Sequence, residues 1–266
     1  MFKNKLLNTL ILTTLSAPGL ALAEDAPAVP TPAFTFNIGA TTNYVWRGIT
    51  QTADSPALQG GVDYAHSSGF YAGAWASNIK WIKNEGAASS APVELDTYFG
   101  FKNAFATDFN YDVGFIRYNY PGTYYAQATT GFVKADTQEI YGLIGYKWLT
   151  AKYSYALGDF LTVPDAKGTN YFDLSANYTL PDSTVSLGAH YGKQTYTGSS
   201  VAYTTAGGQN ASYSDYKLSI SKDFSGNIVG FAYTGTDAPK GAGKFYNILG
   251  KDLGKAAWAL SLTRTF

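Results

Sequence analysis

The segment AAWALSLTRTF, residues 256–266, decides the fold that we predict for this chain. Trp258, Leu260 and Leu262 alternate with smaller or polar residues, and the sequence ends on Phe266. A period of two is typical of a β-strand with one apolar face. We expect this strand to close an outer-membrane β-barrel whose outward side chains contact lipid. An edge strand of a soluble β-sandwich is the alternative that so short a segment leaves open.

The other end of the chain has the pattern of a secretory signal. Lys3 and Lys5 precede a short, interrupted apolar run that ends in a small-residue cleavage site, Ala21-Leu22-Ala23. An uncleaved membrane anchor fits this run less well, because a spanning helix needs about 20 apolar residues. We expect residues 1–23 to be a cleaved signal peptide and the proline-rich residues 24–33 to be a flexible periplasmic leader.

The composition is that of an exported β-rich protein. The chain has 22 Tyr, 16 Phe and 28 Gly, and only 14% of its residues are charged. The absence of cysteine excludes disulfides and thiolate metal sites. Without its signal the chain would carry 17 Lys and Arg against 19 acidic residues, a net charge of −2 that gives no reason to expect a nucleic-acid partner.

Period-two alternation recurs along residues 34–266 and predicts a single transmembrane antiparallel β-barrel in the outer membrane of a Gram-negative bacterium. We expect about twelve strands, near residues 34–47, 57–66, 69–81, 92–103, 107–119, 137–148, 150–159, 169–180, 183–193, 212–222, 226–235 and 256–266. Tight turns alternate with long connections, which is how barrels combine short periplasmic turns with longer extracellular loops. An even number of strands then places both termini in the periplasm.

The apolar face of most strands is expected to contact lipid. Phe36, Ile38 and Tyr44 share such a face in the first strand, whereas the strands near 69–81 and 226–235 are apolar on both faces. Aromatic residues near strand ends predict the girdles of the two membrane interfaces. These residues are Trp46, Tyr71, Trp81, Trp148 and Trp258.

The polar faces collect the charged residues, which we expect to point inward because a Lys or Arg facing lipid costs about 2–4 kcal/mol. The residues predicted to line a pore are Arg47, Asp63, Glu94, Asp96, Lys102, Asp112, Glu139, Lys147, Lys152, Asp173, His190, Asp215 and Lys217. A barrel of twelve strands lies between small filled barrels and wide porins. The charges either line a narrow water-filled channel for passive diffusion of small hydrophilic solutes or pair across the lumen and fill it.

Catalytic patterns are weak in this sequence. His66 lies in the polar turn HSSG, and His190 is expected to project into the lumen near carboxylates. The predicted facing and depth of the side chains place no Ser–His pair beside a carboxylate, so we expect neither catalytic residues nor a cofactor. Glu94 and Asp96 share one strand face, but a single carboxylate pair is poor evidence of a metal site.

Two other classes of function stay open. One is a lipid-modifying barrel enzyme, which requires a Ser–His constellation with a carboxylate or amide. The other is a closed structural or adhesion barrel whose long loops bind partners. In each case the expected partners include outer-membrane lipid and the barrel-insertion machinery, for which the terminal Phe266 resembles the recognised aromatic residue.

Residues 37–81 resemble the opening of the TorF family, whose members are regarded as outer-membrane porins of proteobacteria. The resemblance is carried by NYVWRGITQT, PALQGGVDY, HSSGFYAG and WASN, with VELDTYFGF a little later. It implies an outer-membrane β-barrel that acts as a porin. Arg47-Gly48 would then turn the chain from the first strand into its loop, where Arg47 could reach a lumen carboxylate such as Asp63.

Overall fold

The computed structural model describes residues 33–199, 201, 204 and 210–266. The expected signal peptide and the leader up to residue 32 lie outside the described residues. Ala33, which we expected at the end of the leader, is the first residue of the first strand.

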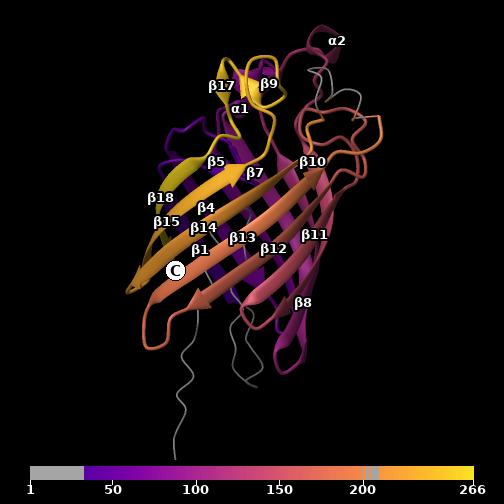
Figure 1. Ribbon diagram of the computed structural model, residues 1–266. Helices are drawn as coiled ribbons and strands as arrows, with labels where there is room; N and C mark the ends of the chain where they lie inside the picture. The colour runs from indigo at the N-terminus through magenta and orange to yellow at the C-terminus, as the bar shows by residue number, and fades with distance from the viewer. Residues whose placement is uncertain (1–32, 200, 202–203, 205–209) are drawn as a thin grey trace, which may run out of the picture.

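Twelve strands close into one antiparallel barrel (Figure 1). They are β1 (Ala33–Thr41), β4 (Ala57–Ala65), β5 (Phe70–Asn78), β7 (Val93–Ala106), β8 (Phe109–Asn119), β10 (Thr137–Tyr146), β11 (Leu149–Ala156), β12 (Asn170–Thr179), β13 (Val185–Thr195), β14 (Tyr213–Phe224), β15 (Asn227–Thr236) and β18 (Ala257–Thr265). Each strand pairs with the next barrel strand along the chain, and β1 closes the ring against β18. The predicted fold class and strand number are confirmed.

The remaining elements are short and lie in the long connections, which gather at one end of the barrel (Figure 1). They are β2 (Val45–Trp46), β3 (Ile49–Thr50), α1 (Trp81–Glu85), β6 (Ala88–Ser90), β9 (Thr123–Tyr124), α2 (Gln127–Thr130), β16 (Asn247–Ile248) and β17 (Lys251–Asp252). Tight turns join the strands at the opposite end, so the predicted alternation of short and long connections is confirmed. In the described part of the chain, neither helix has the length and apolarity needed to span a membrane.

Alternating burial separates the two faces of the barrel wall. Large apolar side chains cover the outside, as in Phe36 at 53% exposed and Leu218 at 59% exposed. The two strands that the sequence left ambiguous are resolved in the same way. In β5 Tyr71 and Trp75 point inward, whereas in β15 Phe231 points outward.

Four aromatic residues differ from the prediction: Tyr71 points into the barrel, and Tyr44, Trp46 and Trp81 are buried in the loops. The first barrel strand ends at Thr41 rather than near residue 47, and Tyr44 and Trp46 are buried in the following loop instead of facing lipid. Trp81 begins α1 and packs edge-on against Tyr120. An aromatic side chain near a strand end gives the same sequence signal whether it faces lipid, points into the lumen or lies under a loop, which is why the girdle prediction was wrong for these residues.

The long loops share a buried apolar layer at their end of the barrel. Its members come from several connections that are far apart in sequence: Trp46, Ile49, Trp81, Ile82, Phe160, Val163, Tyr196, Tyr246 and Leu253. Burial of each large side chain contributes roughly 1.5–3 kcal/mol relative to exposure. The loops therefore form an ordered cover over this end of the barrel, which we call the loop layer.

Inside the barrel, tyrosine rings lie over glycines of the adjacent strand. Tyr98 of β7 stands opposite Gly73 of β5, and Tyr71 of β5 stands opposite Gly100 of β7. A methyl group on Gly73 would lie 2.5 Å from Cζ of Tyr98. Only glycine leaves room for the ring at this position, and the ring covers backbone that glycine leaves bare.

Candidate functional site

A tight hairpin from the first loop enters the barrel interior. In this inner hairpin, Val45–Thr50, strands β2 and β3 pair through Val45 with Thr50 and through Trp46 with Ile49. The two turn residues, Arg47 and Gly48, have φ values of 45° and 78°. Positive φ at both positions is the geometry of the type I′ turn that joins two-residue hairpins.

The turn touches the wall of the barrel. A Cβ on Gly48 would lie 2.5 Å from the side chains of Asp215 in β14 and Thr236 in β15, so the backbone approaches the wall as closely as a glycine allows. The hydroxyl of Tyr213 donates a hydrogen bond of 2.6 Å to the carbonyl oxygen of Arg47. The inner hairpin is therefore fixed at its tip by contacts with strands far from it in sequence.

The Arg47 guanidinium is enclosed by charged and aromatic groups. Its Nη2 lies 2.7 Å from Oε2 of Glu139, and its Nη1 donates to Oε1 of Glu139 at 3.0 Å and to Oε1 of Gln194 at 3.1 Å. The guanidinium carbon lies 4.3 Å from the centroid of the Trp46 ring and 4.4 Å from that of Tyr171. A bidentate carboxylate and two aromatic faces are the environment that suits a planar guanidinium.

The partner of Arg47 differs from the one that the sequence suggested. Arg47 binds Glu139 of β10, whereas Asp63 accepts a hydrogen bond of 2.5 Å from the hydroxyl of Tyr98. Tyr118 also donates to Glu139, at 3.3 Å. The expected partner was wrong because nothing in the sequence shows how far a loop folds into the lumen.

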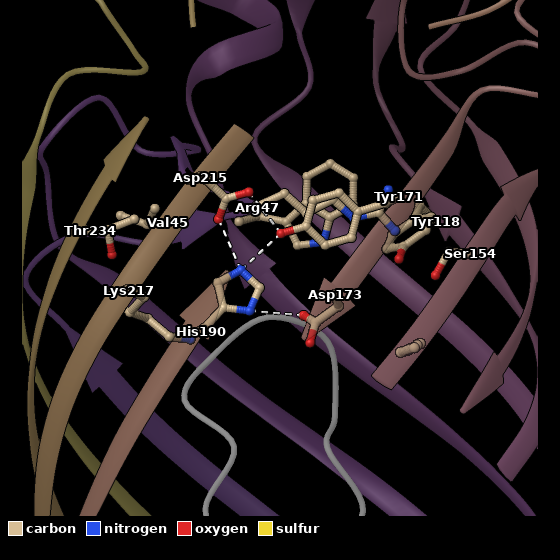
Figure 2. A pocket seen from close by; sticks show the side chains of 13 residues that line it. Val45, Arg47, Tyr118, Ser154, Tyr171, Asp173, His190, Asp215, Lys217 and Thr234 are labelled. Atoms are coloured by element: carbon tan, nitrogen blue, oxygen red, sulfur yellow. Dashed lines mark hydrogen bonds and ion pairs between the residues drawn. The ribbon is translucent and has the colours of Figure 1, made fainter. Parts of the chain in front are cut away.

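A second group of charges surrounds His190 on β13 (Figure 2). Its Nδ1 lies 3.0 Å from Oδ2 of Asp173, and its Nε2 lies 3.0 Å from Oδ1 of Asp215. The hydroxyl of Tyr171 donates to Asp215 at 2.8 Å and lies 3.0 Å from the same Nε2. Tyr171 thus contacts both this cluster and Arg47, so the two groups form one polar network inside the barrel.

This network contains a Ser–His–carboxylate arrangement that sequence reasoning missed. Ser175 Oγ lies 3.2 Å from Nδ1 of His190 and donates to Asp173 at 2.7 Å. Carboxylates on both ring nitrogens stabilise the doubly protonated imidazolium, which has no lone pair to take a proton from Ser175. In that state His190 is a positive charge in the lumen and not a general base for Ser175.

The other predicted residues lie at different depths. Asp112 accepts a hydrogen bond of 2.6 Å from Tyr71, and Glu94 accepts one of 3.0 Å from Tyr44. Asp96 is fully buried, and neither of its oxygens has a hydrogen-bond partner in the described structure. The lysines Lys102 and Lys152 stand over the inward rings of Tyr71 and Tyr141. Lys217 lies opposite His190 in the strand register.

Lys147 is the exception among the predicted lumen residues. It lies in the turn after β10, about half exposed, with its Nζ 3.7 Å from Oδ2 of Asp108. His66 lies in another tight turn, where its Nδ1 is 2.8 Å from Oγ of Ser68. Both side chains are explained by turn structure.

A cavity of ≈ 80 Å³ lies beside the inner hairpin (Figure 2). It is bordered by Arg47, Lys152, His190 and Lys217 together with Asp173 and Asp215. The described residues contain no group of three or more His, Asp or Glu side chains with the arrangement of a metal site. The cavity is thus a small, strongly charged space of mixed sign.

The solved structures with a similar fold include two porins. KdgM porin aligns with a TM-score of 0.54 at 7% identity, covering 87% of this chain and 99% of its own. NanC porin aligns with a TM-score of 0.51 at 9% identity, covering 88% and 99%. Identities this low establish the fold alone. No curated protein matches the chain, and residues 24–266 match the model of a family, Gcw_chp, described as a bacterial protein of unknown function.

Proposed function

The chain belongs to the bacterial family Gcw_chp, and we propose that it is a porin-like channel for passive diffusion of small hydrophilic solutes across the outer membrane. The observation that carries this proposal is the closed barrel with an apolar exterior and a charged interior. Leu218 and Leu260 are more than half exposed outside, whereas Glu94, Asp96 and Glu139 are buried inside. Charge on the inner wall and apolar surface on the outer wall suit a pore in a bilayer.

The inner hairpin narrows this channel in our proposal. Arg47 reaches from the first loop to Glu139 on the opposing wall, and the loop layer covers the same end of the barrel. Solutes then pass when the hairpin moves away from the wall. A closed barrel with partner-binding loops is the second candidate, and the same inward hairpin favours it.

Location and assembly follow from the same proposal. In this proposal the exposed apolar band contacts outer-membrane lipid. Residues 1–23 direct export, and the barrel-insertion machinery recognises Phe266. The likeness of residues 37–81 to the TorF family supports a porin of this kind. The tight turns, such as the one at Asp182, then face the periplasm, and the loop layer faces the outside.

Single-channel recording on the refolded full chain tests the channel. We expect discrete conductance steps in KCl, with a preference for cations because carboxylates outnumber basic groups on the inner wall. Glu94→Gln combined with Asp96→Asn should shift the reversal potential in a KCl gradient toward that of anions. Asp108→Asn, at an exposed turn, is the matched control and should leave it unchanged.

The recording also separates the two candidates. A silent wild type that begins to conduct when Arg47 is replaced by Ala would support a channel closed by the inner hairpin. A barrel that stays silent in both forms would refute the channel and select the closed barrel.

A further inference from the structure

We propose that the wall groups around Arg47 form a binding site for guanidinium and similar planar cations, and that Arg47 occupies this site in place of a solute. The inference rests on the proposed channel and names the class of solute that it would admit. In this view the inner hairpin carries an internal mimic of the solute and competes with it.

The partners of Arg47 belong to the barrel wall and not to the loop. Glu139 lies on β10, Tyr171 on β12 and Gln194 on β13, and their exposed fractions are 0%, 5% and 1%. These strands are held by the barrel's own hydrogen bonds, so the three groups keep their arrangement when the inner hairpin withdraws. The site is therefore built into the rigid part of the molecule.

The shape of the site selects a planar fork of donors. Glu139 accepts through both oxygens, at 3.0 Å and 2.7 Å, and Gln194 adds a third acceptor at 3.1 Å. The ring of Tyr171 covers one face of the plane at 4.4 Å. An ammonium group supplies a compact charge but neither the parallel N–H pair nor a flat face, so it fills the site less completely.

The inner hairpin holds Arg47 in an unfavourable backbone conformation, which favours reversible release of the hairpin. Arg47 has a φ of 45°, a conformation that non-glycine residues adopt at a cost of about 1–2 kcal/mol. Its contacts with Glu139 and Tyr171 offset that cost. A soluble cation that takes over these contacts would release the turn from its unfavourable backbone conformation.

The carboxylates of the surrounding wall favour a cation after Arg47 leaves, although Lys152 borders the cavity beside the inner hairpin, where its Nζ lies 4.0 Å from the centroid of the Tyr141 ring. Glu139 would then lose its bidentate partner. On nearby β7, Glu94 and Asp96 are buried, and the oxygens of Asp96 already have no hydrogen-bond partner in the described structure. An unpaired buried carboxylate is costly, so the vacated site gains from binding positive charge.

Chemical rescue of Arg47→Ala tests the inference. Guanidinium chloride at low millimolar concentration is added to the folded variant, and sodium chloride at the same ionic strength is the reference. We expect guanidinium to raise the unfolding temperature in a saturable way, as a ligand of the folded state does. Methylammonium should bind about tenfold more weakly, the factor expected for the loss of about one hydrogen bond. Guanidinium should also reduce the conductance of this variant.

Two matched variants complete the experiment. Arg47→Ala combined with Glu139→Gln should lose the saturable response, since the bidentate acceptor is gone. Arg117→Ala removes an arginine whose ion pair with Asp136 is exposed, and it should show no rescue. If Arg47→Ala does not fold, Arg47→Lys provides the same comparison with a charge kept at the hairpin tip.

The outcomes distinguish the site from the channel. A response to guanidinium no greater than to sodium, or an equal response without Glu139, would overturn the guanidinium site even if the protein conducts. A saturable response in a protein that never conducts would leave the site standing and refute the channel.

Discussion

The loop layer should become less stable as the pH rises, because of Glu85. This residue ends α1 and borders a cavity of ≈ 50 Å³ within the layer. Burial raises the pKa of Glu85 to about 7, and the hydrogen bond from Thr162 at 2.9 Å offsets only part of that rise. The titratable groups around it are the tyrosines Tyr124, Tyr196 and Tyr246.

The sign and size of the effect follow from linkage. A free glutamate has a pKa of 4.5, so the folded layer holds the Glu85 proton more tightly than the unfolded loop does. The contribution to stability is complete below about pH 4.5, falls as the pH rises through 7, and is constant above. The shift sets an upper limit of about 3 kcal/mol. Since part of Glu85 remains accessible to water, we expect about 1–2 kcal/mol.

Hydrogen exchange of loop amides, corrected for intrinsic rates, measures this loss of stability. The amides of Ala87 and Phe160, both hydrogen-bonded within the layer, report its opening. Glu85→Gln imitates the protonated acid and should match the wild type near pH 4.5 but be more stable at pH 8. Lys83→Gln, on the same helix but exposed, should keep the wild-type dependence. Parallel profiles for wild type and Glu85→Gln would refute the reasoning.

Three further predictions concern topology, assembly and packing. An epitope inserted at Gly241 should bind antibody on intact cells, whereas one at Asp182 should not; labelling at Asp182 would reverse the proposed orientation. Phe266→Ala should reduce the amount of folded barrel in the membrane, measured by heat-modifiable mobility on gels, although the backbone bonds of residue 266 to β1 remain available. Wild-type levels would contradict a role in assembly. Gly73→Ala should destabilise the barrel by about 1–3 kcal/mol in urea titration through overpacking against Tyr98. An unchanged midpoint with an unchanged slope would show that the ring moves aside without cost.

The strand pattern was predictable because each barrel strand obeys one local rule. Phe172, Leu174 and Tyr178 face outward on β12 while Tyr171 and Asp173 face inward, and the alternation is legible in the sequence itself. Turn residues such as Pro181-Asp182 mark where the chain reverses. These signals depend only on neighbours along the chain, so the number and order of strands could be predicted.

The interior arrangement depends on partners that lie far apart in sequence. The contact of Arg47 with Glu139 joins residues 92 positions apart, and that of Tyr171 with Asp215 joins residues 44 positions apart. The sequence could predict that these side chains face inward. Predicting which of them pair would require knowledge of the shear of the barrel and of the path of the first loop. The motif Arg47-Gly48 did signal a turn. Its direction into the lumen had no local signal.

The facing of tyrosine and glycine on β5 and β7 has a consequence for how the barrel is put together. Each strand carries a tyrosine followed two residues later by a glycine. Because the strands are antiparallel, Tyr71 lies opposite Gly100 and Gly73 lies opposite Tyr98. A slip of two residues in one direction would set Tyr71 against Tyr98, and in the other direction it would set Gly73 against Gly100. A slip of one would turn the two hydroxyls to the outer face of the barrel. Among these registers only the observed one places each tyrosine ring over a glycine, so the pair of contacts selects the alignment of the two strands by shape.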